Sequence, residues 1–151
     1  MALSRLESLY RQVILDHSSR PRNFGALDQA TGSLELDNPT CGDVIHLHLR
    51  LVDDRIEDVS FTGHGCSIST ASASMMTEQI KGKTIDESKQ MIEEFLLLVQ
   101  GAELEDSHLG DAEVLSGVAK FPARIRCATL SWKALERMLL NPTQNAKEES
   151  K

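Results

Sequence analysis

The first part of the chain carries apolar residues at helical spacing. They fall at steps of three and four, at Leu3, Leu6, Tyr10, Val13 and Ile14. This spacing predicts an amphipathic helix over residues 3–17. Pro21 ends it, because the residue before a proline avoids helical backbone angles. We expect a loop to follow, through Asn23 and Gly25.

The next part of the chain alternates between apolar and polar residues, a period of two that is typical of strands. Leu34 and Leu36 are apolar in a first segment. In a second, one face carries Ile45, Leu47, Leu49 and Leu51, and the other carries His46, His48 and Arg50. Residues 52–55 can turn, and residues 57–61 suit a third strand. The pattern therefore predicts antiparallel strands with one face buried.

After residue 65 the period becomes helical again. Helices are expected over residues 68–80, 86–101 and 125–139, with a short helical turn at 112–115. Thr84 and Glu87 have the spacing of a capping box at the start of the second of these helices. Strands first and helices after predict an α+β fold: a small antiparallel three-stranded sheet with helices packed on one face. We expect one domain over residues 1–141 and a disordered polar tail over 142–151.

Charge and composition exclude several classes of protein. The formal net charge is -7, which argues against nucleic-acid binding, since such a chain lacks the cations to neutralise phosphates. The longest apolar run, residues 95–99, is too short to cross a membrane, and the N-terminus does not have the apolar core of a signal peptide. We therefore expect a cytoplasmic protein, in which the three cysteines are not structural disulfides. Metal binding or thiol chemistry remains.

All three cysteines lie at the ends of predicted elements. Cys41 is in a loop before the second strand, Cys66 is at the start of a helix, and Cys127 is in the first turns of the last helix. Helix N-termini favour a thiolate, which is both the metal ligand and the nucleophile. We expect the three sulfurs to converge on one Zn²⁺, although the 25 and 61 residues between them do not show this.

Three thiolates need a fourth ligand to complete a tetrahedral zinc site. Asp43, two residues after Cys41, is the favoured candidate, and His64, two residues before Cys66, is the alternative. Three thiolates and a carboxylate around Zn²⁺ give the site a formal charge of -2, which nearby cations would stabilise. Arg124 and Arg126 flank Cys127 and can supply them.

Each of these features also has a simpler interpretation. A lone cysteine is often a buried core residue, and a closed four-ligand zinc site is usually structural. Asp43 can be an ordinary turn residue, and His46 and His48 are most simply polar residues on the outer face of a strand. Three cysteines at glycine-rich element ends, with an aspartate beside one of them, favour a shared site.

The cysteine segments resemble a known family. They are similar to the three cysteine motifs of the IscU/NifU-N family of iron–sulfur assembly proteins, at Pro39-Thr40-Cys41-Gly42-Asp43, Gly63-His64-Gly65-Cys66-Ser67-Ile68-Ser69 and Arg126-Cys127. Asp16-His17 and residues 21–25 also look like that family, and the resemblance covers about residues 4–140. Arg126 stands where the scaffold branch has a histidine, and Lys120-Phe121-Pro122-Ala123-Arg124 stands where it has a chaperone-binding Leu-Pro-Pro-Val-Lys segment. These departures resemble the SufU branch.

The resemblance implies a function and partners. In the SufU branch, a zinc-dependent sulfurtransferase takes persulfide sulfur from a SufS-type cysteine desulfurase, and the residue matching the sulfur acceptor is Cys41. Zinc is then held by Cys41, Asp43, Cys66 and Cys127, and downstream cluster-assembly proteins are further partners. The alternative is a scaffold that assembles and transfers a transient [2Fe–2S] cluster, because thiolates suit iron–sulfur clusters as well as zinc. A purely structural zinc domain is the third hypothesis.

Overall fold

A computed structural model describes residues 2–38, 42–101, 109–120 and 122–140, with backbone alone for residues 2–10, 111, 117, 119 and 120. In chain order the elements are α1 (Ala2–Ser19), β1 (Gly32–Asn38), β2 (Asp43–Val52), β3 (Arg55–His64), α2 (Ser67–Ile80), α3 (Ile85–Leu98), the 3₁₀ helix η1 (Gly110–Lys120) and α4 (Pro122–Leu140). The predicted α+β class is confirmed. Cys41, the expected tail over 142–151 and the side chains of Leu3, Leu6 and Tyr10 lie outside the described residues.

The three strands form one antiparallel sheet in the order β1-β2-β3. The strand period holds along β2, whose odd-numbered residues from 43 to 49 are buried while the even-numbered ones between them are half-buried. At the β2–β3 turn Asp53 and Asp54 both have positive φ, 49° and 63°, as a two-residue hairpin of the favoured twist requires. The register of the hairpin pairs Val44 with His64, so the end of β3 lies beside the start of β2.

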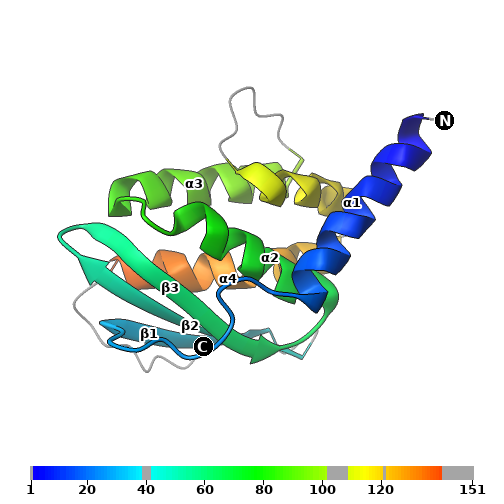
Figure 1. Ribbon diagram of the computed structural model, residues 1–151. Helices are drawn as coiled ribbons and strands as arrows, with labels where there is room; N and C mark the ends of the chain where they lie inside the picture. Colours follow the sequence, from blue (N-terminus) through cyan, green and yellow to red (C-terminus); the bar gives the residue numbers. More distant parts are fainter. Residues whose placement is uncertain (1, 39–41, 102–108, 121, 141–151) are drawn as a thin grey trace.

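The helices cover one face of this sheet, as Figure 1 shows. The indole of Trp132 in α4 stacks on Phe95 in α3, with ring centroids 4.2 Å apart. Its Nε1 donates a hydrogen bond to Oγ of Ser72 in α2, and that hydroxyl donates to the carbonyl of Ala128. Small buried residues along α2, such as Ala71 and Ser72, allow α4 to approach closely. The core therefore joins α2, α3 and α4 to the buried face of the sheet.

The segment before α4 is more regular than the predicted short turn at 112–115. It is a 3₁₀ helix over Gly110–Lys120. Buried apolar residues recur at steps of three, from Leu109 just before the helix to Ala112, Leu115 and Val118 within it. Side chains three residues apart align on one face of a 3₁₀ helix, so this spacing fits the observed element. α4 then begins at Pro122, where a helix tolerates proline because the first turn needs no N–H partner.

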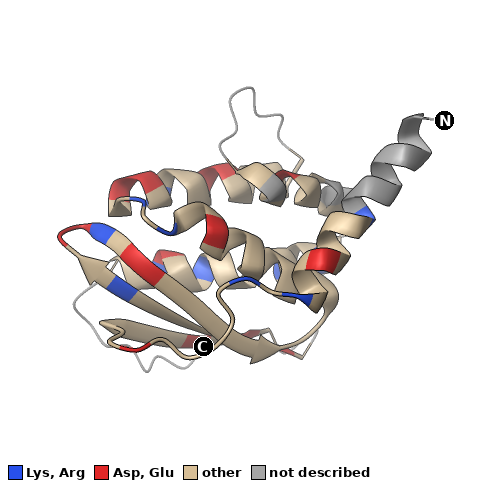
Figure 2. Cartoon of the chain, in the orientation of Figure 1, with Lys and Arg blue, Asp and Glu red and all other residues tan. Residues whose placement is uncertain are grey.

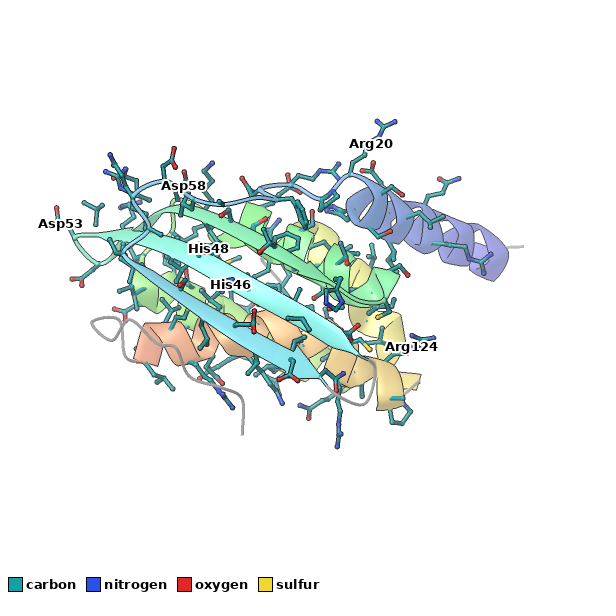
Figure 3. All side chains as sticks on the ribbon, turned by 90° about the horizontal axis from the view of Figure 1, so that it is seen from below. Arg20, His46, His48, Asp53, Asp58 and Arg124 are labelled. Atoms are coloured by element: carbon teal, nitrogen blue, oxygen red, sulfur yellow. The ribbon has the colours of Figure 1, made fainter. Side chains whose placement is uncertain are left out.

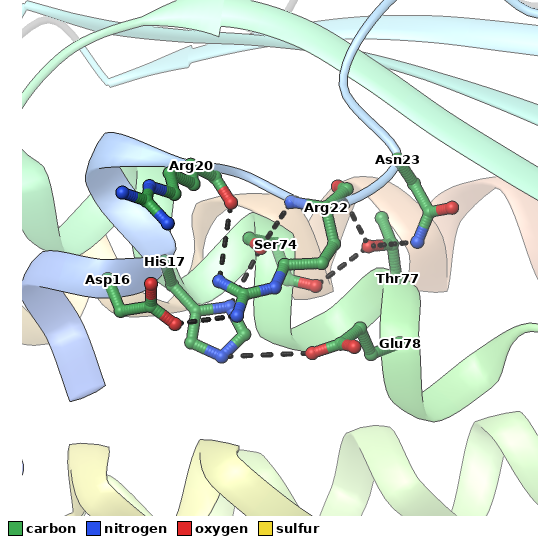
Figure 4. Close-up of polar contacts among 8 residues, drawn as sticks. All are labelled: Asp16, His17, Arg20, Arg22, Asn23, Ser74, Thr77 and Glu78. Carbon is green, nitrogen blue, oxygen red and sulfur yellow. Dashed lines mark hydrogen bonds and ion pairs between the residues drawn. The ribbon is translucent and has the colours of Figure 1, made fainter.

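A polar cluster fastens the end of α1 and the following loop to α2 (Figure 4). The buried imidazole of His17 places Nδ1 2.8 Å from Oγ of Ser74, and the same hydroxyl accepts a hydrogen bond from the backbone N–H of Arg22. Nε2 of His17 lies 3.7 Å from the carboxylate of Glu78. The side chain of Arg22 donates to Asp16 over 2.6 Å, and this hydrogen bond lowers the pKa of Asp16.

The surface carries charges of both signs. Figure 2 shows acidic and basic positions interspersed over the described helices and strands, most densely at the β2–β3 turn. No described helix is both long enough and apolar enough to pass through a lipid bilayer.

Candidate metal centre

Three of the predicted metal ligands meet at one end of the sheet. Asp43 begins β2, Cys66 immediately precedes α2, and Cys127 lies in the second turn of α4. A carboxylate oxygen of Asp43 and the two sulfurs all lie within 4.8 Å of one another, and among the described residues this is the only such group of three or more His, Cys, Asp or Glu side chains. Asp43 and Cys127 are fully buried and Cys66 is half-buried. The fold thus gathers residues separated by up to 84 positions in the sequence.

Cys66 is the N-cap of α2. Its backbone is extended (φ -72°, ψ 164°), and its sulfur accepts a hydrogen bond from the backbone N–H of Ser69 over 3.4 Å. An N-cap side chain satisfies one of the N–H groups left open at the start of a helix. These N–H groups and the helix dipole stabilise negative charge at this position. The sulfur of Cys66 therefore sits at the positive end of the α2 dipole, among backbone donors.

Asp43 is held by the same segment. Its Oδ1 accepts a hydrogen bond from the backbone N–H of Cys66 over 2.8 Å, while Oδ2 lies 4.0 Å from the sulfur of Cys66. One carboxylate oxygen thus fixes the side chain and the other faces the cluster.

Gly65 makes this contact possible. Its φ is +152°, and a Cβ at this position would lie 2.2 Å from Oδ1 of Asp43, far inside van der Waals contact. The residue before Cys66 therefore has to be glycine if the carboxylate is to stay in place.

The other predicted site residues are placed differently. His64, the alternative fourth ligand, is exposed at the end of β3 and is not part of the three-residue cluster. Arg124 and Arg126 are exposed in the first turns of α4, and Figure 3 shows Arg124 at the same end of the sheet as the start of β2. Cys41, the predicted sulfur acceptor, lies outside the described residues, but Gly42 directly follows it and donates a backbone hydrogen bond to Asn38 over 2.8 Å.

Two buried polar residues beside the cluster were not predicted from the sequence. Asn38 is paired with Asp43 in the β1–β2 register, and Ser69 lies in the first turn of α2. Asn38 Nδ2 and Ser69 Oγ are buried without a hydrogen-bond partner in the described structure. Buried polar atoms are nearly always paired, so each has the capacity to donate to an anionic group at this site. The signal for Asn38 is its place at the strand end, just before the cysteine loop.

The donor set fits a zinc ion. Zinc favours four ligands in a tetrahedron, with bonds of about 2.3 Å to sulfur and about 2.0–2.2 Å to carboxylate oxygen. Ligand atoms in such a site are about 3.5–4 Å apart, so the cluster, whose atoms lie within 4.8 Å of one another, needs only small side-chain movements. The side-chain N–H of Asn38, unpaired among the described residues, can stabilise the negative charge that thiolate and carboxylate ligands bring. With Cys41 two residues from Asp43, a fourth ligand is within reach along the chain.

The two histidines of β2 lie on the opposite face of the strand from Asp43. Their rings contact each other with centroids 4.4 Å apart. Burial, and secondarily the neighbouring His46, lower the pKa of His48. His48 is therefore neutral near neutral pH, although it is on the outer face of the sheet.

A three-stranded antiparallel sheet with helices on one face, and a carboxylate and two thiols converging at its end, defines a small α+β protein with a candidate thiolate metal site. A model of the NifU-like N terminal domain matches residues 9–128. The chain belongs to this NifU-N family, which confirms the resemblance of the cysteine motifs.

The similarity extends over most of the chain. Over 135 residues it is 56% identical to the zinc-dependent sulfurtransferase SufU of Bacillus subtilis (strain 168), covering 89% of this chain and 91% of that protein. It is 50% identical over 140 residues to the iron–sulfur cluster assembly scaffold protein IscU of Streptococcus pyogenes serotype M1, covering 92% and 87%. The crystal structure of FiSufU from Fervidobacterium islandicum AW-1 superposes with a TM-score of 0.81 at 37% identity, covering 85% of this chain and 94% of that one. These relatives support a role in iron–sulfur cluster assembly.

Proposed function

We propose that this protein is a zinc-binding sulfur acceptor that takes persulfide sulfur from a SufS-type cysteine desulfurase for iron–sulfur cluster assembly. The observation that carries the proposal is the convergence of Asp43, Cys66 and Cys127 within 4.8 Å. The similarity to a zinc-dependent sulfurtransferase over nearly the whole chain supports it. With Cys41 as the fourth ligand, the site would have the three thiolates and one carboxylate expected from the sequence.

Zinc, when bound, would keep its thiolate ligands deprotonated without adding redox chemistry of its own. The chain's residues then divide into two roles. Asp43, Cys66 and Cys127 are fixed on β2, α2 and α4 and form the constant part of the site. Cys41 is the nucleophile, and its position in the sequence falls between β1 and β2.

The transfer is a thiol–disulfide type of exchange. The Cys41 thiolate attacks the outer sulfur of the persulfide on the desulfurase cysteine. A new sulfur–sulfur bond forms on Cys41, the old one breaks, and the desulfurase cysteine leaves as a thiolate. One sulfur atom moves and no external oxidant or reductant is needed. The pyridoxal phosphate that generates the persulfide belongs to the desulfurase.

The second candidate is a scaffold that assembles a [2Fe–2S] cluster on the same residues. The 50% identity to a protein named as an IscU scaffold favours it. The scaffold branch of the family has a histidine immediately before the third cysteine. This chain has Arg126 there and so lacks one potential cluster ligand. We therefore rank sulfur transfer first, with the scaffold as the alternative.

The test combines metal analysis with sulfur transfer. The purified chain is expected to be colourless with one zinc ion, and to stimulate cysteine turnover by a SufS-type desulfurase. Mass spectrometry should find one added sulfur atom on the peptide that contains Cys41. The Cys41→Ser variant should lose both the stimulation and the added sulfur.

The outcomes separate the three hypotheses. Brown protein with visible absorbance and bound iron would favour the scaffold. Zinc that is required for folding, together with a Cys41→Ser variant that stimulates the desulfurase normally, would favour a structural zinc domain. Cys66→Ser serves as the matched cysteine control, since it should lower zinc affinity while Cys41 remains present.

A further inference from the structure

Two neighbouring histidines lie on the outer face of the sheet. His46 and His48 are two residues apart on β2, so both project from the same face of the strand, and both are half-buried. Figure 3 shows them side by side along the centre of the sheet, on the side away from the helices. Their ring centroids are 4.4 Å apart with a 40° tilt, so the two imidazoles already lie against each other.

The surroundings of the pair are polar. Ser60 lies directly across from His48 in the β2–β3 register, and Glu35 lies directly across from His46 in the β1–β2 register. The side chain of Ser60 is almost fully buried, at 6% exposure, and its Oγ has no hydrogen-bond partner in the described structure. A buried hydroxyl in this condition marks a place where a further polar group or a coordinated water can be accommodated.

The cation that follows the pair on the same face of β2 is already neutralised. Arg50, two residues beyond His48, makes an ion pair with Glu57 over 3.2 Å and donates a hydrogen bond to Gln29 over 2.7 Å. Its charge therefore opposes a bound cation only weakly. Glu35 is exposed, and a change of rotamer would bring its carboxylate toward His46.

We propose that His46 and His48 form a second metal site, a two-imidazole chelate for a borderline divalent transition metal such as Zn²⁺ or Ni²⁺, with Glu35 as an additional oxygen ligand. Neutral imidazole is a preferred ligand of these ions. Two imidazoles held on one rigid strand bind one ion more tightly than two separate histidines, because the second ligand is at a high effective concentration. In the structure the carboxylate of Glu35 is not grouped with the two rings within 4.8 Å, so the histidine pair is the preformed part.

This site is separate from the cysteine centre. Asp43 lies on the buried face of β2, whereas the two histidines lie on its outer face. Asp43 and His46 are also three positions apart along the strand, about 10 Å at the usual rise per residue. Filling one site therefore leaves the ligands of the other available.

The test uses the full-length, untagged protein loaded with one zinc ion, so that the cysteine centre is occupied, and Ni²⁺ as the probe. Isothermal titration calorimetry should show one further Ni²⁺ ion bound. His46→Gln and His48→Gln should each lower the Ni²⁺ affinity roughly tenfold or more, and the double variant should lower it little further. This pattern is specific to a chelate, since either substitution already breaks it.

His64→Gln is the matched control, because it removes one exposed histidine that is not part of the pair; it should leave the Ni²⁺ affinity unchanged. As a measurement that needs no variant, paramagnetic Ni²⁺ should broaden the imidazole resonances of His46 and His48 before those of His17 and His64. The proposal is overturned if the double variant binds Ni²⁺ as the parent does. It is equally overturned if the loss of Ni²⁺ affinity in the double variant is the product of the two single losses, as for independent sites. It is also overturned if the resonances of other histidines broaden first.

Discussion

Oδ1 of Asp43 accepts a hydrogen bond from the backbone N–H of Cys66 over 2.8 Å, and this bond joins the start of β2 to the start of α2. It fixes the carboxylate with one oxygen and leaves the other toward the sulfur of Cys66. The bond also ties two candidate metal ligands to each other before any ion is present. The geometry of the centre should therefore depend on the residue that lets these two segments approach, which is Gly65.

Gly65→Ala should lower zinc affinity. The added Cβ would lie 2.2 Å from Oδ1 of Asp43, so either the carboxylate or the backbone at Cys66 has to move. A misplaced ligand weakens a metal site strongly, and we expect a loss of at least about tenfold, the scale seen when groups that orient metal ligands are removed. Competition with a chromophoric zinc chelator measures the loss.

Gly25→Ala is the control for backbone strain. Gly25 also has a positive φ, +133°, but no atom lies within 4 Å of the position of its Cβ. Gly25→Ala should lower the free energy of unfolding by about 1–2 kcal/mol, because of the unfavourable backbone angle, and leave zinc affinity unchanged. If both variants bind zinc like the parent protein, the close approach at Gly65 does not position the carboxylate.

The sheet and the long helices could be predicted because their patterns are local. Alternation along β2 and the helical spacing in α2 and α4 each identify one buried face without knowledge of the fold. Only a short part of the 3₁₀ helix, at 112–115, was predicted, because the buried apolar residues of this segment, three positions apart, match neither the period of a strand nor that of an α-helix. A three-residue apolar period is the signal that was available.

The site was only partly predictable. The choice of Cys66 and Cys127 rested on their positions at element ends, and that of Asp43 on its distance from Cys41. The contact between Asp43 and Cys66 depends on the pairing of Val44 with His64, which no local pattern specifies. A different pairing, that of β1 with β2, puts Asn38 opposite Asp43. Such relationships are properties of the assembled sheet, so they could not be derived from the spacing of residues.

His17→Ala should loosen the first helix. It removes a buried ring and leaves the hydroxyl of Ser74 without one of its partners. Burying an unsatisfied polar group and opening a cavity together should lower the free energy of unfolding by on the order of 2–3 kcal/mol. Hydrogen exchange should accelerate first in residues 11–25, because Ser74 also accepts from the backbone N–H of Arg22.

Ser18→Ala is the matched control for the same helix end. Ser18 is half-buried, and its hydroxyl makes an exposed, local hydrogen bond to the carbonyl of Leu15. It should change stability by less than about 0.5 kcal/mol. Uniform acceleration of exchange throughout the chain in His17→Ala would show that the cluster supports the whole fold and not this segment.

The capping box of α3 predicts a pH dependence of stability. The backbone N–H of Thr84 donates to Glu87 over 3.0 Å, and the Thr84 hydroxyl accepts from the backbone N–H of Glu87. The hydrogen bonds from the backbone and then the side chain of Thr84 lower the pKa of Glu87 below its ordinary value of 4.5. A carboxylate with a lowered pKa in the folded state contributes stability that is present above the unfolded pKa and is lost as the pH falls through the folded pKa.

Glu87→Gln should therefore be less stable than the parent protein near neutral pH, and the difference should shrink as the pH falls below about 4.5. Denaturant titrations at several pH values measure it. The control is Glu93→Gln, at an exposed position in the middle of α3; its stability difference from the parent protein should not shrink in this way as the pH falls.

Thr84→Ala should cost about 1 kcal/mol of stability at neutral pH through the lost cap. It should reduce the effect of Glu87→Gln only in part, because the substitution removes the hydroxyl but keeps the backbone N–H, which is the larger cause of the lowered pKa of Glu87.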